Sequence, residues 1–153
     1  METTQERSVS FFRFEDLRIY TKATDYCAWL SRSLRAAGNE AELNLVNAFC
    51  RSAYDIALNI AEGSSRNKSQ FEHNLKISKT AIRECIVFTT VALNLGLIDE
   101  DHYNQSREYL MEMTRMIGAL IISLQRAPRH YDNDYADEEE AETETSETND
   151  LSF

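Results

Sequence analysis

The chain contains few of the residues that interrupt helices: one proline and four glycines among 153 residues. Because proline and glycine are the strongest breakers of regular helices, their scarcity predicts long helices joined by short turns. A chain of this length is expected to form one domain with its own hydrophobic core.

Long apolar runs are also missing. No stretch reaches the roughly 18 uninterrupted apolar residues of a membrane span, and residues 1–10 lack the apolar region of a signal peptide. Cysteine is scarce, and Cys27, Cys50 and Cys85 form no C-x-x-C pair. They are predicted to be reduced, buried thiols. We therefore expect a cytoplasmic protein that is not bound to a membrane.

Basic residues are missing from the last part of the chain. Through His130 the chain has 16 basic and 16 acidic residues, whereas residues 131–153 have 10 acidic residues and no basic one. The net charge of −10 therefore arises wholly in this last part. The argument that an acidic protein avoids nucleic acid consequently applies to the last part and not to the body of the chain.

Apolar residues recur every three or four positions, the spacing of one helical face, along four stretches. These stretches predict helices at about 14–37, 40–62, 70–95 and 100–125. Four helices with short connections predict an all-α, antiparallel up-down-up-down four-helix bundle over residues 12–128. Residues 1–11 are expected to be a flexible N-terminus. Residues 129–153 are expected to be a disordered acidic tail, because they have too few apolar side chains to offset the entropy of ordering.

The second turn is the most informative stretch. Gly63 is predicted to end the second helix in the left-handed conformation, and Ser69 with Glu72 to form a capping box that begins the third. Asn59 and Glu62 are neighbours on one helix surface. They are predicted either to fix the turn, through bonds to backbone or to an arginine, or to belong to a binding surface.

Similar signals mark the other two turns. Gly38 is predicted to end the first helix, and Asn39 with Glu42 to begin the second in the manner of a capping box. At the last turn, Gly96 is predicted to take the left-handed position after the third helix, and Asp99 to cap the fourth.

The segment Asn59-Ile60-Ala61-Glu62-Gly63-Ser64-Ser65-Arg66, followed by Phe71-Glu72 and Thr80-Ala81-x-x-Glu84, resembles the four-helix bundle family encoded in intervening sequences of bacterial 23S ribosomal RNA genes. The opening Phe14-Glu15-Asp16-Leu17-Arg18-Ile19-Tyr20 and the turn Leu93-x-Leu95-Gly96-Leu97-Ile98 are similar to that family as well. The resemblance covers roughly residues 12–126. The chain departs from the family pattern at Thr80, where serine is expected, and in the acidic tail, which has no counterpart in the family.

The resemblance implies a four-helix bundle, a homopentamer, and rRNA or DNA as the class of ligand. A diversity-generating retroelement accessory protein belongs to the same structural group, so the resemblance implies the architecture more firmly than any activity.

Three basic residues of the third predicted helix share one face, because Lys76, Lys79 and Arg83 are spaced i, i+3, i+7. Such a face is either an ordinary solvated helix surface or a stripe that follows nucleic-acid phosphates. The candidate nucleic-acid-binding residues also include Arg66, Lys68, Arg18 and Lys22.

Sites for catalysis or metal binding are poorly supported. The nearest match to the Glu-x-x-His of a di-iron bundle is Asp99-x-x-His102, where the aspartate is better explained as a cap. Glycine-rich phosphate loops are absent, and no histidine is placed beside a thiol to activate it. We therefore expect a protein that is not an enzyme and that has no metal or cofactor.

Apolar residues outside the main stripes predict self-association, because a monomer should not expose so much apolar surface. The candidate interface residues are Ile19, Tyr26, Trp29, Phe88 and Val91. The residues themselves indicate only more than one copy. In the middle of the third helix, Glu84 is predicted to pair with Arg51 or another basic residue.

The acidic tail suggests an alternative function. It ends in Leu151-Ser152-Phe153, which is similar to the tails of bacterial single-stranded-DNA-binding proteins, whose terminal phenylalanine binds a pocket of a partner protein. The chain would then be a protein-interaction adaptor. The tail could also serve only for solubility, or fold over the basic faces and compete with nucleic acid.

Overall fold

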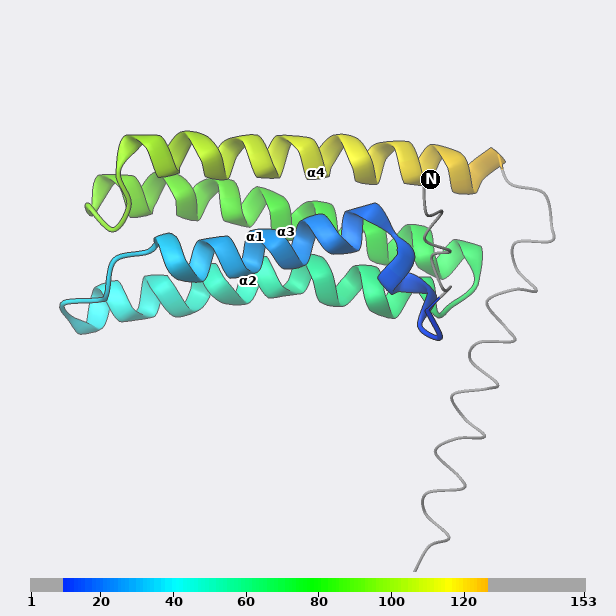
Figure 1. Ribbon diagram of the computed structural model, residues 1–153, viewed down its shortest axis with the longest axis horizontal. Coiled ribbons are helices and arrows are strands. Elements are labelled where there is room, and N and C mark those ends of the chain that lie inside the picture. Colours follow the sequence, from blue (N-terminus) through cyan, green and yellow to red (C-terminus); the bar gives the residue numbers. More distant parts are fainter. Residues whose placement is uncertain (1–9, 127–153) are drawn as a thin grey trace, which may run out of the picture.

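The computed structural model describes residues 10–126, and this part is all-α (Figure 1). A short 3₁₀ helix and four α-helices follow one another: η1 (Arg13–Asp16), α1 (Arg18–Ser33), α2 (Glu40–Ser64), α3 (Lys68–Asn94) and α4 (Glu100–Arg126). The prediction of four helices is confirmed. None of the four is long and apolar enough to cross a membrane. The predicted acidic tail, with Leu151 and Phe153, lies outside the described residues.

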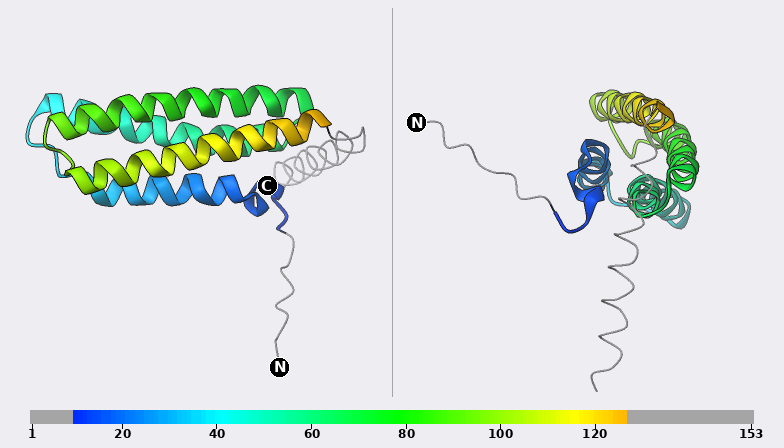
Figure 2. Two further views of the ribbon diagram at one scale, coloured as in Figure 1. Left: turned by 90° about the horizontal axis from the view of Figure 1, so that it is seen from above. Right: turned by 90° about the vertical axis from the view of Figure 1, so that its right-hand side faces the viewer.

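The four helices form a ring in which α1 packs against both α2 and α4, and α3 packs against α2 and α4 (Figures 1 and 2). The α1–α4 seam shows the relative direction. Trp29 Nε1 donates to Gln105 Oε1 at 3.1 Å, and Lys22 Nζ lies 2.8 Å from Glu112 Oε2. The later residue of α1 thus contacts the earlier residue of α4, so these two helices are antiparallel.

The first helix is shorter at both ends than the sequence predicts. Phe14 lies in η1, and α1 ends at Ser33 instead of Ala37. The backbone then becomes extended, with ψ of 130° at Leu34. The amide of Arg35 donates to the carbonyl oxygen of Leu97, in the α3–α4 turn, at 2.8 Å. Gly38 therefore does not end the helix, because this tertiary hydrogen bond already draws the chain away from it.

Two of the predicted helix starts are confirmed. Asn39 Oδ1 accepts from the Glu42 amide at 2.9 Å and caps α2, and Asp99 Oδ1 accepts from the His102 amide at 2.8 Å and caps α4. Gly96 has a φ of +71°, the left-handed conformation predicted for the residue after α3.

The capping box predicted for α3 is wrong. Helix α3 begins at Lys68, so Ser69 lies inside it, and Asn67 is the cap. Asn67 Oδ1 accepts from the Gln70 amide at 3.0 Å. Both asparagine and serine suit this role, and the chain turns two residues earlier than the serine would require.

The left-handed conformation predicted for Gly63 is also wrong. Gly63 is buried inside α2, and among the described glycines only Gly96 has a positive φ. A Cβ atom added at Gly63 would lie 2.7 Å from the Cβ of Asn74 and 3.0 Å from Cδ1 of Phe71, both on α3. Gly63 is therefore required for the close approach of α2 to α3 rather than for a turn.

Three hydroxyl groups form a chain in the core, where Tyr26, Thr89 and Ser106 are all fully buried. Thr89 Oγ1 donates to the carbonyl oxygen of Cys85 at 2.7 Å, and Ser106 Oγ lies 2.8 Å from both Thr89 Oγ1 and the Tyr26 hydroxyl. Each hydroxyl has one proton, so one direction satisfies all three donors: Tyr26 to Ser106, Ser106 to Thr89, Thr89 to the carbonyl. The chain joins α1, α4 and α3.

A Gly63→Ala variant should be less stable than the parent by about 1–3 kcal/mol, because the new methyl group meets a Cβ atom that cannot move without its backbone. Gly118→Ala is the matched control. It lies within α4, where an added Cβ meets nothing within 4 Å, and should raise the free energy of unfolding by about 0.5–1 kcal/mol. Urea denaturation of both variants at one protein concentration measures the difference. Equal effects would show that α2 and α3 can separate at no cost.

Candidate functional site

Two of the five predicted interface residues offer no apolar surface to a partner, and two more are half-buried. Ile19 and Tyr26 are 3% and 0% exposed and belong to the core. Trp29 is half-buried, stacked on Tyr26 with ring centroids 5.9 Å apart, and Phe88 packs on Phe49 at 5.7 Å. The prediction is therefore wrong for Ile19 and Tyr26, because the stripe of α1 that faces α4 is part of the core. Val91 alone is exposed, at 36%.

Other apolar side chains are exposed, mainly on α2 and α3. Leu58 of α2 is 61% exposed and Val87 of α3 is 59% exposed. The remaining exposed apolar residues of these two helices are Leu43, Tyr54, Ile77 and Val91. Sequence reasoning missed most of this set. The signal that could have found it is the i, i+4 spacing of Tyr54 and Leu58 outside the main stripe of α2.

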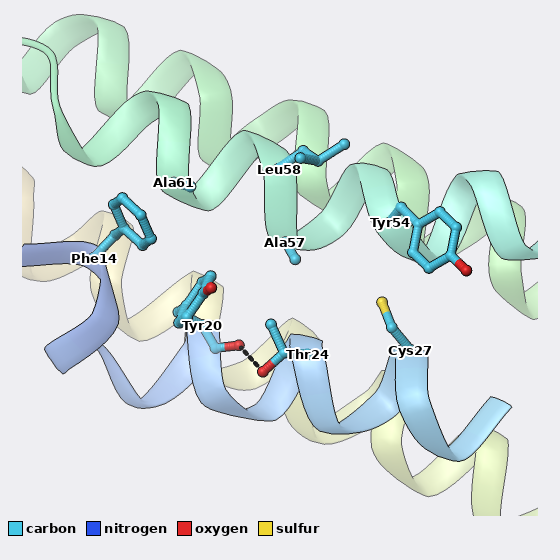
Figure 3. A pocket seen from close by; sticks show the side chains of 8 residues that line it. All are labelled: Phe14, Tyr20, Thr24, Cys27, Tyr54, Ala57, Leu58 and Ala61. Carbon is cyan, nitrogen blue, oxygen red and sulfur yellow. Dashed lines mark hydrogen bonds between the residues drawn. The ribbon is translucent and has the colours of Figure 1, made fainter. Parts of the chain in front are cut away.

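An apolar groove lies between α1 and α2 (Figure 3). Its volume is about 560 Å³, and it is lined by Phe14, Tyr20, Thr24, Cys27, Tyr54, Ala57, Leu58 and Ala61. Thr24 satisfies its hydroxyl within α1 by donating to the Tyr20 carbonyl oxygen at 3.2 Å. The groove therefore presents carbon surface and few free polar groups, which suits another apolar side chain better than a polar ligand.

The predicted basic residues of α3 lie on the side of that helix nearest α4, where Lys76 and Arg83 are exposed and Lys79 is half-buried. We call Lys76, Lys79 and Arg83 the basic stripe. Glu72 lies one turn before Lys76 on the same face and accepts from Gln125 Nε2 of α4 at 2.9 Å. Lys76 pairs with Glu72 at 3.3 Å. Within residues 10–126, neither Lys79 nor Arg83 forms an ion pair with a carboxylate. These two cations are therefore available to an external anion.

One further basic residue lies at the level of the basic stripe. The contacts of Thr89 with Ser106 and of Glu72 with Gln125 set the register between α3 and α4. In this register, exposed Arg115 of α4 is opposite the middle of the stripe. Sequence reasoning missed it, because the register between helices is not visible in the periodicity of either one.

The remaining candidate basic residues are placed differently. Lys22 is held in the α1–α4 seam by Glu112 and lies 4.9 Å from the centroid of the Tyr109 ring. Arg18 is exposed on α1, and Lys68 is the first residue of α3. The structure therefore does not bring all seven candidates together on one face.

The turn residues have structural partners. Asn59 Nδ2 donates to the carbonyl oxygen of Asp55 at 2.9 Å, and Arg66 Nε donates to Glu62 Oε1 at 2.7 Å. This is what the structural interpretation of Asn59 and Glu62 predicts. The pairing of Glu84 with Arg51 is wrong, because Glu84 Oε2 instead accepts from Ser52 Oγ at 2.8 Å.

Four groups of the described chain have a raised pKa: Tyr26 and Cys85 are buried, whereas Cys27 and Cys50 are half-buried. Burial raises the pKa of the Cys27 thiol to about 11, and the neighbouring Cys50 adds to this effect. Burial also raises the pKa of Cys50, Cys85 and Tyr26. Thiols that stay protonated are poor nucleophiles and poor metal ligands.

The described residues contain no group of three or more His, Cys, Asp and Glu side chains that could hold a metal ion. His102 Nδ1 lies 2.6 Å from Asp99 Oδ1, and the hydrogen bonds of His102 lower the pKa of the aspartate. This pair is explained by the capping of α4.

Comparison with known proteins places these surfaces in a family context. The family model described as 23S rRNA-intervening sequence protein matches residues 15–119, which is more than half of the chain. The match runs from η1 to the second half of α4 and includes the basic stripe and every lining residue of the α1–α2 groove except Phe14. No curated protein sequence matches the chain.

The buried thiols predict a loss of stability at alkaline pH. Above the ordinary thiol pKa of 9.0, Cys85 ionises in the unfolded chain but stays protonated in the folded one. The unfolded state then binds fewer protons, so the free energy of unfolding falls as pH rises, by about 1.4 kcal/mol per pH unit for this thiol. Urea denaturation between pH 8 and about 10.5 measures the slope. Cys85→Ala should reduce the slope by about 1.4 kcal/mol per pH unit, and an unchanged slope would mean that Cys85 ionises freely in the folded protein.

Proposed function

We propose that this chain, which belongs to the 23S rRNA-intervening sequence protein family, is a non-enzymatic cytoplasmic binding protein that self-associates and binds nucleic acid through the basic stripe. The observation that carries the proposal is the pair Lys79 and Arg83, two cations on one face of α3, half-buried and exposed respectively, without a carboxylate partner among the described residues. Ammonium and guanidinium groups at such spacing contact phosphate oxygens and release counterions from the nucleic acid.

The proposed mode of binding follows the backbone and does not read bases. A bundle helix that is packed on two neighbours presents only one face, and the face of α3 between Lys76 and Arg83 carries donors suited to phosphates. Arg115 of α4 adds a fourth cation at the same level. Binding should therefore depend strongly on salt and weakly on sequence.

The absence of enzymatic activity is part of the proposal. Catalysis requires a titratable group whose pKa is tuned toward the working pH in a cleft that excludes water. In the described chain the apolar groove is lined by one thiol, Cys27, whose pKa is raised away from neutrality. Three surface carboxylates have a lowered pKa: Glu42, Glu72 and Asp99. Each accepts hydrogen bonds from backbone amides at a helix start or from neighbouring side chains.

Self-association is proposed to use the apolar surface of α2 and the α1–α2 groove. Tyr54 and Leu58 are 47% and 61% exposed at the rim of the groove. Contiguous apolar surface of this kind is costly to leave in water and marks interaction sites. Resemblance to the family favours a pentamer. A ring of copies would repeat the basic stripe around its circumference and so strengthen binding to one nucleic acid molecule.

Reversing the charge of the stripe should weaken binding. A Lys79→Glu/Arg83→Glu variant is expected to lose at least about tenfold in affinity for duplex RNA or DNA at low salt. The magnitude of the slope of log K against log salt should decrease by about 1.8 for duplex DNA, because two phosphate contacts are lost. Titration of fluorescent RNA and DNA duplexes at several salt concentrations measures both quantities.

The matched control is Arg32→Glu/Arg51→Glu, which changes the same charge at exposed arginines of α1 and α2. It should leave the affinity nearly unchanged. Equal loss in both variants would show that only the overall charge matters, and no binding by the parent protein would refute the proposal.

A single charge in the apolar surface should disrupt the assembly. Leu58→Lys is expected to reduce the mass measured by light scattering toward that of one chain, because burying an unpaired ammonium group is costly. Met111→Lys is the control, since Met111 is 43% exposed on α4, away from the groove. Dissociation of the Met111 variant and not of the Leu58 variant would show that the interface lies on α4 instead.

A further inference from the structure

The basic stripe lies close to the point where the described chain ends. Gln125, next to the last residue of α4, donates to Glu72 in the second turn of α3. From there Lys79 and Arg83 are seven and eleven residues further along α3, about 10 and 17 Å at 1.5 Å per residue. Helix α4 therefore ends beside the beginning of α3, next to one end of the stripe (Figures 1 and 2).

The sequence after this point has the opposite charge. Of the ten acidic residues between 131 and 153, six lie in residues 132–140, with no basic residue among them. The nearest of these, Asp132, is six residues beyond Arg126, which allows a reach of up to about 20 Å. A flexible tether of about ten residues has a root-mean-square length near 18 Å. The acidic run thus has the length needed to meet Lys79 and Arg83.

We propose that residues 132–140 of this same chain dock on the basic stripe and compete there with nucleic acid. The inference rests on the proposed function for its consequence, although the docking itself requires only the stripe and the acidic run. The docked acidic run would supply carboxylate partners for Lys79 and Arg83, which have none within residues 10–126.

Because residues 132–140 belong to the same chain as the stripe, even a weak contact between them would compete with nucleic acid. A flexible linker of this length gives an effective concentration of about 1 mM. If the contact has an intrinsic dissociation constant of about 0.1 mM, as is usual for nonspecific polyanion binding, the acidic run lowers the affinity for nucleic acid about tenfold. The competition should disappear in salt, because the ion pairs are exposed and the Debye length falls to about 3 Å at 1 M.

Chemical acylation of lysines tests the docking without any nucleic acid. The full-length protein is compared with a full-length variant in which all six acids of residues 132–140 are replaced by Asn or Gln. The extent of acylation at each lysine is measured by mass spectrometry, at low and at high salt. Neutralising the acids should increase the acylation of Lys79 several-fold at low salt and leave it unchanged at high salt.

Lys22 is the internal control, because it pairs with Glu112 in the α1–α4 seam and should react equally in both proteins. Equal acylation of Lys79 in both proteins at low salt would overturn the docking. Protection of Lys79 that grows with protein concentration would also overturn it, because the acidic run would then come from another copy.

Binding of duplex RNA and DNA by the same two proteins separates the docking from the proposed function. About tenfold tighter binding by the neutralised variant, lost in high salt, supports both. Protection of Lys79 without binding of nucleic acid by either protein would leave the docking and refute the function. Binding that is equal in the two proteins would leave the function and refute the competition.

Discussion

The arrangement of this bundle depends on three buried hydroxyl groups that can bond in only one direction. Tyr26, Ser106 and Thr89 come from three different helices, and each loses its bond to water on folding. An unpaired hydroxyl in the core costs about 1–3 kcal/mol, whereas the completed chain of bonds leaves none unpaired. Rotation of α1, α3 or α4 about its own axis would break the chain, so the hydroxyls fix which face each of these helices turns outward.

The two proposed surfaces follow from this fixed rotation. With Thr89 turned inward, α3 presents Lys76, Lys79 and Arg83 to solvent on its α4 side. The close approach at Gly63 sets the spacing of α2 to α3, and α2 presents Tyr54 and Leu58 toward the α1–α2 groove. The basic stripe on α3 and the groove between α1 and α2 thereby lie on different parts of the bundle. The proposed binding of a polyanion and the proposed self-association would therefore use different surfaces.

Much of the fold could be predicted from the sequence, because the signals involved are local. Periodicity gives the four helices, and the caps at Asn39 and Asp99 and the left-handed Gly96 are recognised from residues within one turn. The two wrong assignments at the second turn have one cause, which is the packing of α3 against α2. Gly63 and Ser69 match the local pattern of a stop and a start, but α2 continues through Gly63 because Phe71 and Asn74 of α3 pack against it.

The sequence by itself determined the family, the four helices, the balanced charge of the body beside the acidic last part of the chain, and the shared face of Lys76, Lys79 and Arg83. Each depends on residue order or on the fixed geometry of a single helix. Only the tertiary structure decided that Ile19 and Tyr26 are core rather than interface, and that Arg115 joins the level of the basic stripe. Those outcomes depend on the rotation and register of one helix against another, which are set by contacts between residues far apart in the chain.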